Sequence, residues 1–294
     1  MTSEGPGGRS AVIVVSSHVA RGAVGNRAAV FALQQLGFPV WAVPTVVLPW
    51  HPGHGAATRI VPDPDQFAAL VRDLESSPWI GEVGAVLSGY LGDADQAVAV
   101  ASLVSAVKAR NPEALYLCDP VMGDAGGLYV PEATAAAMRD LLMPLADIAT
   151  PNRFELEWLA GETLGDNRAI GQAALRMGPS RMLVTSAHAL MAGSIGNLLV
   201  TPREMVLAEH RSVPKPPNGT GDLAAALFLA RLMEGRSAEK ALQITAASVF
   251  EVVARAVKRQ ADELMLETDA QSLVHPMAMV QMRRLVHPDG ERRA

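Results

Sequence analysis

The stretch GAVLSGYLGDADQAVAVASLVSAVKARNPEALYLCD, at residues 84–119, decides the fold. It begins with a short apolar run at 84–88 and ends with another at 115–119. Between them, residues 93–110 space their apolar side chains with the 3.6-residue period of a helix. A strand, a helix and a second strand in this order indicate a βαβ unit, whose two strands run parallel in one sheet.

The same alternation continues in both directions along the chain. Its strand runs are almost entirely apolar, as in parallel strands that helices cover on both faces. The sequence therefore predicts an α/β protein with a central, mostly parallel sheet and helices on both faces. Further strands are predicted at 11–16, 40–47, 147–149 and 181–185, and further helices at 26–36, 65–75, 131–143 and 167–177.

The pattern changes after residue 185. Two short runs at 197–200 and 205–211 flank the tetrapeptide TPRE, which predicts an antiparallel hairpin. A Pro-rich break follows this hairpin. Two long helices are then predicted, at 222–234 and 238–257.

The chain offers no linker long enough to divide it into two domains. We therefore expect a single domain at residues 11–260, preceded by a flexible N-terminus at 1–10. For residues 261–294 the sequence leaves two alternatives open, a terminal helix and a loose tail.

Composition excludes several classes of protein. The chain has 294 residues, a net charge of -5 and only 4% aromatic side chains, which argues against a nucleic-acid partner. It lacks both a membrane-length apolar run and a secretory signal. Its lone cysteine, Cys118, allows no intrachain disulfide, so we expect a cytoplasmic protein without a membrane partner. The one basic cluster, interpreted as a solvated terminal segment, consists of Arg283, Arg284, Arg292 and Arg293.

The sharpest local motif is NGTGDL at residues 218–223, which leads directly into the apolar run AAALF. Two glycines at the start of a buried helix leave backbone N–H groups free, and the helix dipole favours an anion there. Asp222 on the first turn is placed to take a proton from a hydroxyl group. The alternative is a plain glycine turn with Asp222 as a helix cap.

Two further motifs follow predicted strands. CDPVMGD at residues 118–124 carries two aspartates that could hold Mg²⁺, although ordinary turn chemistry is an equal alternative. TPNRFE at residues 150–155 opens a helix, with Asn152 and Glu155 on one side of its first turn. Glu155 could bind a metal-coordinated water, while a simple helix start explains the same residues.

Histidines add weaker signals. SSHV at residues 16–19 ends the first predicted strand, where Ser17 and His18 could bind a polar ligand, although a structural histidine is the more frequent outcome. His51 and His54 flank Pro52 and Gly53, so a loop or a pocket wall is favoured over a zinc pair. No G-x-S-x-G elbow, P-loop or dinucleotide-binding G-x-G-x-x-G is present, which excludes those classes.

What strengthens the weak motifs is their shared position. Ser17, Asp119, Thr150, Thr185 and the turn at Gly219 all lie at the carboxyl ends of predicted strands or just before helices. In open α/β sheets ligands bind at this edge. We therefore expect these residues to face one common site.

At this point the chain resembles the pyridoxal kinases of the ribokinase superfamily, from about residue 11 to residue 257. The resemblance implies a three-layer ribokinase-like fold and a homodimer. It also implies ATP-dependent phosphorylation of the 5′-hydroxymethyl group of pyridoxal. The motifs that carry the resemblance are SHVARGAVGNRAA at 17–29, LSGYL at 87–91, CDPVMGD at 118–124, LYVP at 128–131, TPNRFE at 150–155 and GTGDL at 219–223.

The resemblance assigns the catalytic roles to the glycine turn. Gly219, Thr220 and Gly221 would form an anion hole over the γ-phosphoryl group, and Asp222 would accept the proton of the substrate hydroxyl. Such an arrangement suits phosphoryl transfer, which needs alignment and neutralisation of negative charge rather than a covalent intermediate.

The implied cofactors are ATP and Mg²⁺, with K⁺ or another monovalent cation as an optional ligand. By resemblance the metal set is Asp119, Asp124 and Glu155, while Thr150 and Thr185 match positions associated with the monovalent cation and ATP. The remaining implied nucleotide-binding positions are Asn152, Ser186, Val213 and Thr220.

The resemblance also implies a substrate site. Ser17 would hydrogen-bond the pyridoxal ring, and Tyr129 would lie on a mobile flap near the phosphates. Pro52 stands where the family has a threonine that touches the substrate, and proline has neither a hydroxyl nor an N–H group to donate. His51 or His54 could replace that contact. The residues expected around the ring are Val24, Leu48 and Tyr90.

Because of Pro52, two alternatives stay beside pyridoxal phosphorylation. One is a kinase for a related hydroxymethyl compound such as hydroxymethylpyrimidine. The other is a non-catalytic protein that binds a vitamer or a nucleotide, against which the intact turn at residues 219–222 argues.

Overall fold

The computed structural model describes residues 8–288 of the chain. Most of the expected flexible N-terminus, and the tail arginines Arg292 and Arg293, lie outside the described residues.

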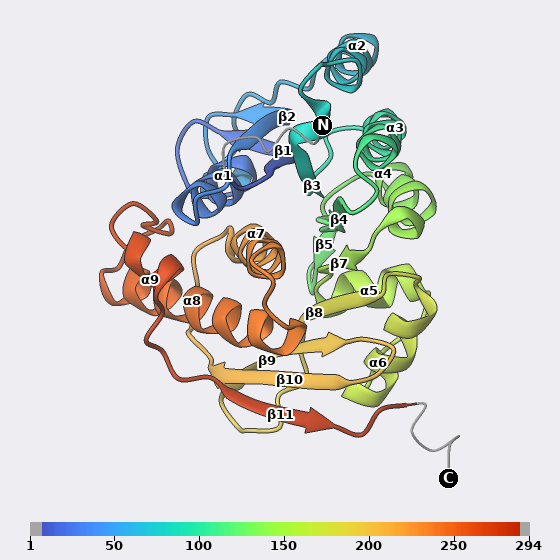
Figure 1. Ribbon diagram of the computed structural model, residues 1–294. Coiled ribbons are helices and arrows are strands. Elements are labelled where there is room, and N and C mark those ends of the chain that lie inside the picture. The colour runs from blue at the N-terminus through green and yellow to red at the C-terminus, as the bar shows by residue number, and fades with distance from the viewer. Residues whose placement is uncertain (1–7, 289–294) are drawn as a thin grey trace.

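A single large sheet organises the described chain, with strand order β11-β10-β9-β8-β7-β4-β3-β1-β2 (Figure 1). Neighbouring strands from β2 to β8 are parallel. Three antiparallel pairs complete the sheet: β8 with β9, β9 with β10, and β10 with β11. The predicted mostly parallel sheet and the predicted hairpin are both confirmed. The strands are β1 Ala11–Val19, β2 Val40–Leu48, β3 Val83–Ser88, β4 Leu115–Cys118, β7 Ile148–Ala149, β8 Arg181–Ala187, β9 Ser194–Val200, β10 Met205–Arg211 and β11 Gln281–Leu285.

Helices cover both faces of this sheet, which gives three layers (Figure 1). One apolar core joins the sheet to α1, α7 and α8, and a second joins the opposite face to α2, α3, α4, α5 and α6. The predicted three-layer α/β architecture is therefore correct. The helices are α1 Asn26–Gln35, α2 Pro64–Glu75, α3 Asp95–Arg110, α4 Glu132–Ala137, α5 Arg153–Ala160, α6 Asn167–Arg176, α7 Thr220–Met233, α8 Ala238–Lys258 and α9 Ala270–Val274.

Helix α7 is the most deeply buried of these helices. Every residue from 223 to 231 is buried, because α7 lies against the sheet and is flanked by α1 and α8. Its apolar sequence on all sides leaves it no face that can be solvated. The burial fixes the position of its N-terminus, which carries the glycine turn.

The helix predicted at 131–143 is regular only over α4. A wider turn at Met138–Leu142 and a tight one at Met143–Leu145 replace its second half. Pro144 cannot donate a backbone hydrogen bond, so the regular helix cannot continue through it.

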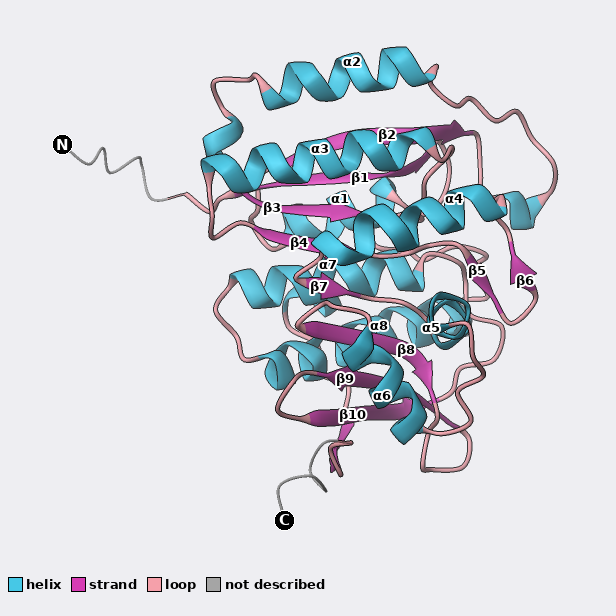
Figure 2. Cartoon of the chain, turned by 90° about the vertical axis from the view of Figure 1, so that its right-hand side faces the viewer, coloured by secondary structure: helices cyan, strands magenta, loops and turns pink. Residues whose placement is uncertain are grey.

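A short hairpin that the sequence did not predict as strands follows β4. Its strands, β5 Gly123–Asp124 and β6 Gly127–Leu128, are too short to show a two-residue period. Figure 2 shows the hairpin at the carboxyl edge of the parallel strands. Residues 123–129, which comprise this hairpin and Tyr129, are called the flap below.

For Arg283, the C-terminal segment corrects the interpretation of the basic cluster as a solvated segment, whereas Arg284 is exposed. Residues 281–285 form β11, which pairs with β10 and extends the sheet. The Arg283 Nε atom donates to the fully buried Glu209 carboxylate at 2.9 Å. Within residues 8–288 no helix has the length and apolarity needed to cross a membrane.

Two neighbouring arginines of β11 provide a matched test of this segment. Arg283→Ala leaves the buried Glu209 carboxylate without its cation and should lower the free energy of unfolding by about 2 kcal/mol. Arg284→Ala breaks an exposed pair with Glu239 and should cost no more than about 0.5 kcal/mol. Urea unfolding of both variants measures the difference, and equal stabilities would show that β11 is only loosely attached.

Candidate active site

A cavity of about 570 Å³ opens at the carboxyl edge of the parallel strands. The candidates His18 and His54 do not line it, whereas the residues to which the resemblance assigns a role all do. These residues are Ser17, Val24, Leu48, Pro52, Tyr90, Asp119, Asp124, Tyr129, Thr150, Asn152, Glu155, Thr185, Ser186, Val213, Gly219, Thr220, Gly221 and Asp222.

The glycine turn forms the floor of the cavity at the N-terminus of α7. Gly219 has a φ of 91°, and a Cβ atom there would lie 2.0 Å from the Ala23 carbonyl oxygen. No side chain caps α7, so its first backbone N–H groups remain available. The turn therefore combines free donors with the positive end of a buried helix, which suits an anion.

Asp222 lies on the first turn of α7 and is partly buried. Burial raises the pKa of its carboxyl group to about 6, against the opposing effect of the Gly25 N–H and its own N–H. A carboxylate with a raised pKa is a better base than an ordinary aspartate.

Asp119, at the end of β4, is the second buried carboxyl group of the site. The Thr150 hydroxyl donates to its Oδ1 atom at 2.8 Å. Burial, followed by the charge of Asp222, raises the pKa of Asp119 to about 8. The two acids thus repel each other across the site when both are ionised.

Asn152 and Glu155 form a capping box at the start of α5. The Asn152 side chain accepts from the Glu155 N–H at 2.9 Å, and Glu155 Oε2 accepts from the Asn152 N–H at 2.7 Å. Glu155 Oε1 also accepts from the Met122 N–H at 3.0 Å, and the Asn152 amide donates to the Gly123 carbonyl at 2.8 Å. The helix-start interpretation is correct, and the same pair fixes the base of the flap.

The oxygen donors of the site include carboxylates, the ligands that suit Mg²⁺. No cluster of three His, Cys, Asp or Glu side chains is preassembled within residues 8–288. However, Glu155, Asp119, Asp222 and Asp124 all raise the pKa of Tyr129, after the larger effect of its removal from water. This concentration of negative charge fits Mg²⁺, which binds through one or two carboxylates together with phosphate oxygens and water.

The flap carries Asp124 and Tyr129 over this acidic group. One Asp124 oxygen accepts from the Gly126 N–H at 2.7 Å, which is the turn chemistry expected from the sequence. The Tyr129 N–H donates to the Met122 carbonyl at 3.0 Å and returns the hairpin to its base. Asp124 therefore has a turn role and also lines the cavity.

One end of the cavity is built mainly from loops. Ser17, Val24, Leu48, Pro52 and Tyr90 meet there, joined by His51 and by Arg59, which the sequence analysis missed. Arg59 lies in a loop without periodicity, so no local signal marked it.

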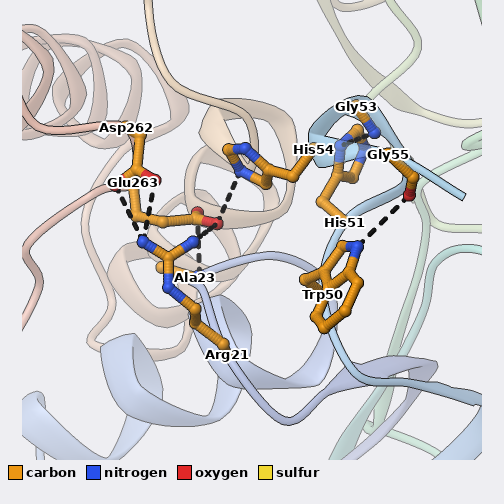
Figure 3. Close-up of polar contacts among 9 residues, drawn as sticks. All are labelled: Arg21, Ala23, Trp50, His51, Gly53, His54, Gly55, Asp262 and Glu263. Atoms are coloured by element: carbon orange, nitrogen blue, oxygen red, sulfur yellow. Dashed lines mark hydrogen bonds and ion pairs between the residues drawn. The ribbon is translucent and has the colours of Figure 1, made fainter. Parts of the chain in front are cut away.

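His51 and His54, the two candidates for replacing the lost threonine contact, separate in the structure. His51 lines the cavity, whereas His54 bonds to Glu263 away from it (Figure 3). His18 does not line the cavity either, although its neighbour Ser17 does.

The other end lies between the antiparallel strands and α8. Thr185, Ser186 and Val213 line it as expected, and Ser186 adopts a φ of 54° at an irregularity of β8. The centroids of the His210 and Phe250 rings lie 4.7 Å apart with the planes tilted by 34°, and the two rings form an aromatic wall. The residues here that the sequence analysis missed are Ile195, Asn197, His210, Ser212, Val249, Phe250 and Val253.

The fold and the site together define a ribokinase-like kinase of small molecules. The family model described as phosphomethylpyrimidine kinase matches residues 65–271. A pyridoxal kinase of Rubrobacter xylanophilus is 41% identical over 286 residues, which cover 95% of this chain and 99% of the relative. The chain belongs to this kinase family, on the branch of the pyridoxal kinases.

Other relatives agree. A pyridoxal kinase of Granulibacter bethesdensis is 38% identical over 275 residues, covering 90% of this chain and 96% of the relative. The solved pyridoxal kinase of Leishmania donovani, in complex with ADP and pyridoxamine, superposes with a TM-score of 0.88 at 26% identity. That match covers 94% of this chain and all of the other.

The two glycines of the turn should respond differently to alanine. Gly219→Ala forces a Cβ atom against the Ala23 backbone at positive φ and should lower the free energy of unfolding by about 3 kcal/mol. Gly221→Ala meets no protein atom within 4 Å, so stability should change by less than about 0.5 kcal/mol. Its methyl group should instead obstruct the anion site and lower turnover about 100-fold.

Thermal unfolding and an ADP-release assay on both variants measure this contrast. Equal stability of the two variants would contradict the structural role of Gly219, and full turnover in Gly221→Ala would contradict an anion site at the turn.

Proposed function

We propose that this protein transfers the γ-phosphoryl group of ATP to the 5′-hydroxymethyl group of pyridoxal, giving pyridoxal 5′-phosphate and ADP. One observation carries the proposal: Asp222, with its raised pKa, lies on the first turn of the uncapped helix α7. Base and anion site therefore belong to the same turn. The pyridoxal kinase relatives support the choice of acceptor.

The proposed chemistry takes place at the glycine turn, where the base and the anion site meet. The substrate hydroxyl lies beside Asp222, which takes its proton as the oxygen bonds to the γ-phosphorus. The bond between that phosphorus and the β–γ bridging oxygen breaks at the same time, and ADP leaves. The N–H groups of Gly219, Thr220 and Gly221 donate hydrogen bonds to the equatorial oxygens and stabilise the negative charge that spreads over them. The flap with Tyr129 covers the phosphates and excludes water from the reaction.

Mg²⁺ is proposed beside Asp119 and Asp124, with the Glu155 carboxylate reaching it through water because backbone donors already occupy both of its oxygens. When bound, Mg²⁺ supplies positive charge to the phosphate oxygens. The Thr150 hydroxyl holds Asp119 in place, and Asn152 holds the flap. Thr150 and Thr185 are also proposed to lie beside a monovalent cation.

The nucleotide is proposed to lie toward β9, β10 and α8. Its phosphates point to the glycine turn, and its base rests on the wall formed by His210 and Phe250. Thr185, Ser186 and Val213 line this end of the cavity. The vitamer then occupies the opposite end, with Ser17 at the ring and Pro52, Leu48 and Tyr90 around it.

A cytoplasmic homodimer is proposed as the working form. The dimer is an expectation from the family. Cys118 is unreactive, since burial raises the pKa of its thiol to about 12 and keeps it protonated.

Pro52 favours one alternative acceptor, hydroxymethylpyrimidine. Pro52 lines the cavity and offers no hydrogen to a ring substituent, so this loop discriminates less than a threonine would. The matching family model is described as phosphomethylpyrimidine kinase, which also supports this alternative.

A substrate panel with ATP separates the acceptors. We expect kcat/KM for pyridoxal to exceed that for hydroxymethylpyrimidine by about tenfold or more, because Ser17 and Arg59 offer donors that match substituents of the pyridoxal ring. Equal values, or a reversed order, would favour the alternative. Asp222→Asn is the matched control, in which turnover should fall about 1,000-fold while ATP binding persists. Binding without turnover in the wild type would favour the non-catalytic protein.

The raised pKa of Asp222 predicts the pH dependence of the reaction. The base must be ionised, so kcat/KM should rise with pH through about 6 and level off above it. An ordinary aspartate would place this limb near pH 4. Initial rates between pH 5 and 8, with pyridoxal and again with pyridoxine, test it. If the pKa of this rise in kcat/KM differs between the two vitamers, the titrating group belongs to the substrate rather than to Asp222.

A further inference from the structure

A polar cluster outside the cavity joins three distant segments of the chain (Figure 3). Arg21 follows β1, His54 lies in the loop after β2, and Asp262 and Glu263 follow α8. Glu263 is 9% exposed and lies at the centre of the cluster. The proposed kinase chemistry gives this buried carboxylate no role.

Both carboxylate oxygens of Glu263 have partners on other segments. Oε1 lies 2.9 Å from His54 Nε2 and 3.7 Å from Arg21 Nη1. Oε2 accepts from the Ala23 N–H at 3.4 Å. Glu263 therefore connects the loop after β2 with the turn after β1.

The turn after β1 is shaped around this carboxylate. Gly22 has a φ of 111°, and a Cβ atom there would lie 2.6 Å from Glu263 Oε1. A side chain at residue 22 would therefore displace Glu263. The close fit shows that the carboxylate is packed into the turn and does not merely rest on its surface.

Each partner of Glu263 is connected to one half of the active site. His54 ends the short turn Pro52–His54, and its N–H donates to the His51 carbonyl at 2.9 Å. Pro52 and His51 of this turn line the proposed vitamer end of the cavity. On the other side, the Ala23 carbonyl is the atom against which Gly219 packs.

The loop after β2 is attached to the rest of the chain at both of its ends. At its start, the Ala20 and Arg21 N–H groups each donate at 2.9 Å to the Leu48 and Pro49 carbonyls. Toward its end, Arg59 donates to the Gly92 carbonyl at 2.7 Å, and Ile60 pairs with Val47. Between these ends, Trp50 and Gly55 bond within the loop itself. The contact between His54 and Glu263 therefore ties the middle of the loop, residues 50–55, to the C-terminal segment.

We propose that Glu263 is a positioning residue that holds the vitamer loop through His54 and supports the phosphoryl-transfer turn through Ala23. The inference rests on the proposed function, in which these two parts bind the acceptor and the γ-phosphoryl group. The C-terminal segment thereby contributes to catalysis without touching the substrate. It also fixes the loop at the place where Pro52 offers no hydrogen bond of its own.

Glu263 has two arms: its contact with His54, called the loop arm, and its contact with the Ala23 N–H, called the turn arm. Two alanine variants separate them. His54→Ala releases only the loop, so KM for pyridoxal should rise about tenfold with kcat almost unchanged. Glu263→Ala releases both arms, so the same rise in KM should come with a fall in kcat of about tenfold. KM for ATP should not change in either variant, because the wall formed by His210 and Phe250 lies at the other end of the cavity.

Two further variants serve as controls. Asp262→Ala removes the neighbouring, exposed ion pair with Arg21 and should leave both KM values and kcat at wild-type levels. Glu263→Gln keeps an oxygen for the Ala23 N–H and should recover most of the kcat lost in Glu263→Ala. Recovery by glutamine would show that the lost hydrogen bond, rather than a general loss of stability, lowered kcat.

The proposal is overturned if Glu263→Ala lowers only the melting temperature, or if it raises KM for ATP as much as KM for pyridoxal. If Glu263→Ala does not fold, the selective effect of His54→Ala on KM decides the loop arm. Glu263→Asp then decides the turn arm, because its shorter side chain keeps the charge but withdraws the carboxylate from the Ala23 N–H and should lower kcat.

Amide hydrogen exchange of the ligand-free proteins separates this proposal from the proposed function. Faster exchange at residues 49–55 and 218–222 in Glu263→Ala, but not in Asp262→Ala, supports the positioning role even if the wild type phosphorylates no vitamer. Unchanged exchange at both segments overturns it.

Discussion

The packing of Gly219 against the Ala23 carbonyl oxygen fixes where the proposed chemistry takes place. A Cβ atom at residue 219 would approach that oxygen to 2.0 Å, so only glycine allows the two backbones to meet. Helix α7 is buried all around and cannot shift to relieve the contact. Its free N–H groups are therefore held at the sheet edge beside Asp222.

This arrangement gathers acidic groups at a cost to stability. Burial, and for Asp119 also the charge of Asp222, raises the pKa values of both carboxyl groups, so the ligand-free protein disfavours their ionised forms. Above pH 8 the folded state must hold both charges in a partly dry cavity. A divalent cation with ATP would offset that repulsion, as is common at sites where function opposes stability.

The two halves of the cavity are built differently. The proposed nucleotide end rests on β8, β9, β10 and α8, whose backbones are fixed by the sheet and the core. The proposed vitamer end depends on loops after β1 and β2, held by a few polar contacts such as that between His54 and Glu263. Loops of this kind accept changes such as Pro52 without altering the fold.

Much of the architecture could be predicted from the sequence. Apolar runs alternating with helical periods determined the three layers and the parallel strands, because burial on both faces imposes that pattern. Local chemistry also marked the glycine turn, the helix start near Asn152 and Glu155, and the strand ends that line the cavity. The short strands β5, β6 and β11 were not predicted, since so few residues show no measurable hydrophobic period.

What the sequence determined by itself was therefore the class of fold and the edge at which the site lies. Only the tertiary structure brought Arg59, His210 and Phe250 to the cavity, because their neighbours come from distant elements. It alone joined Glu263 to His54 and Ala23, residues more than 200 positions away in the chain. Such contacts depend on how loops return across the sheet, and no local pattern of residues specifies that path.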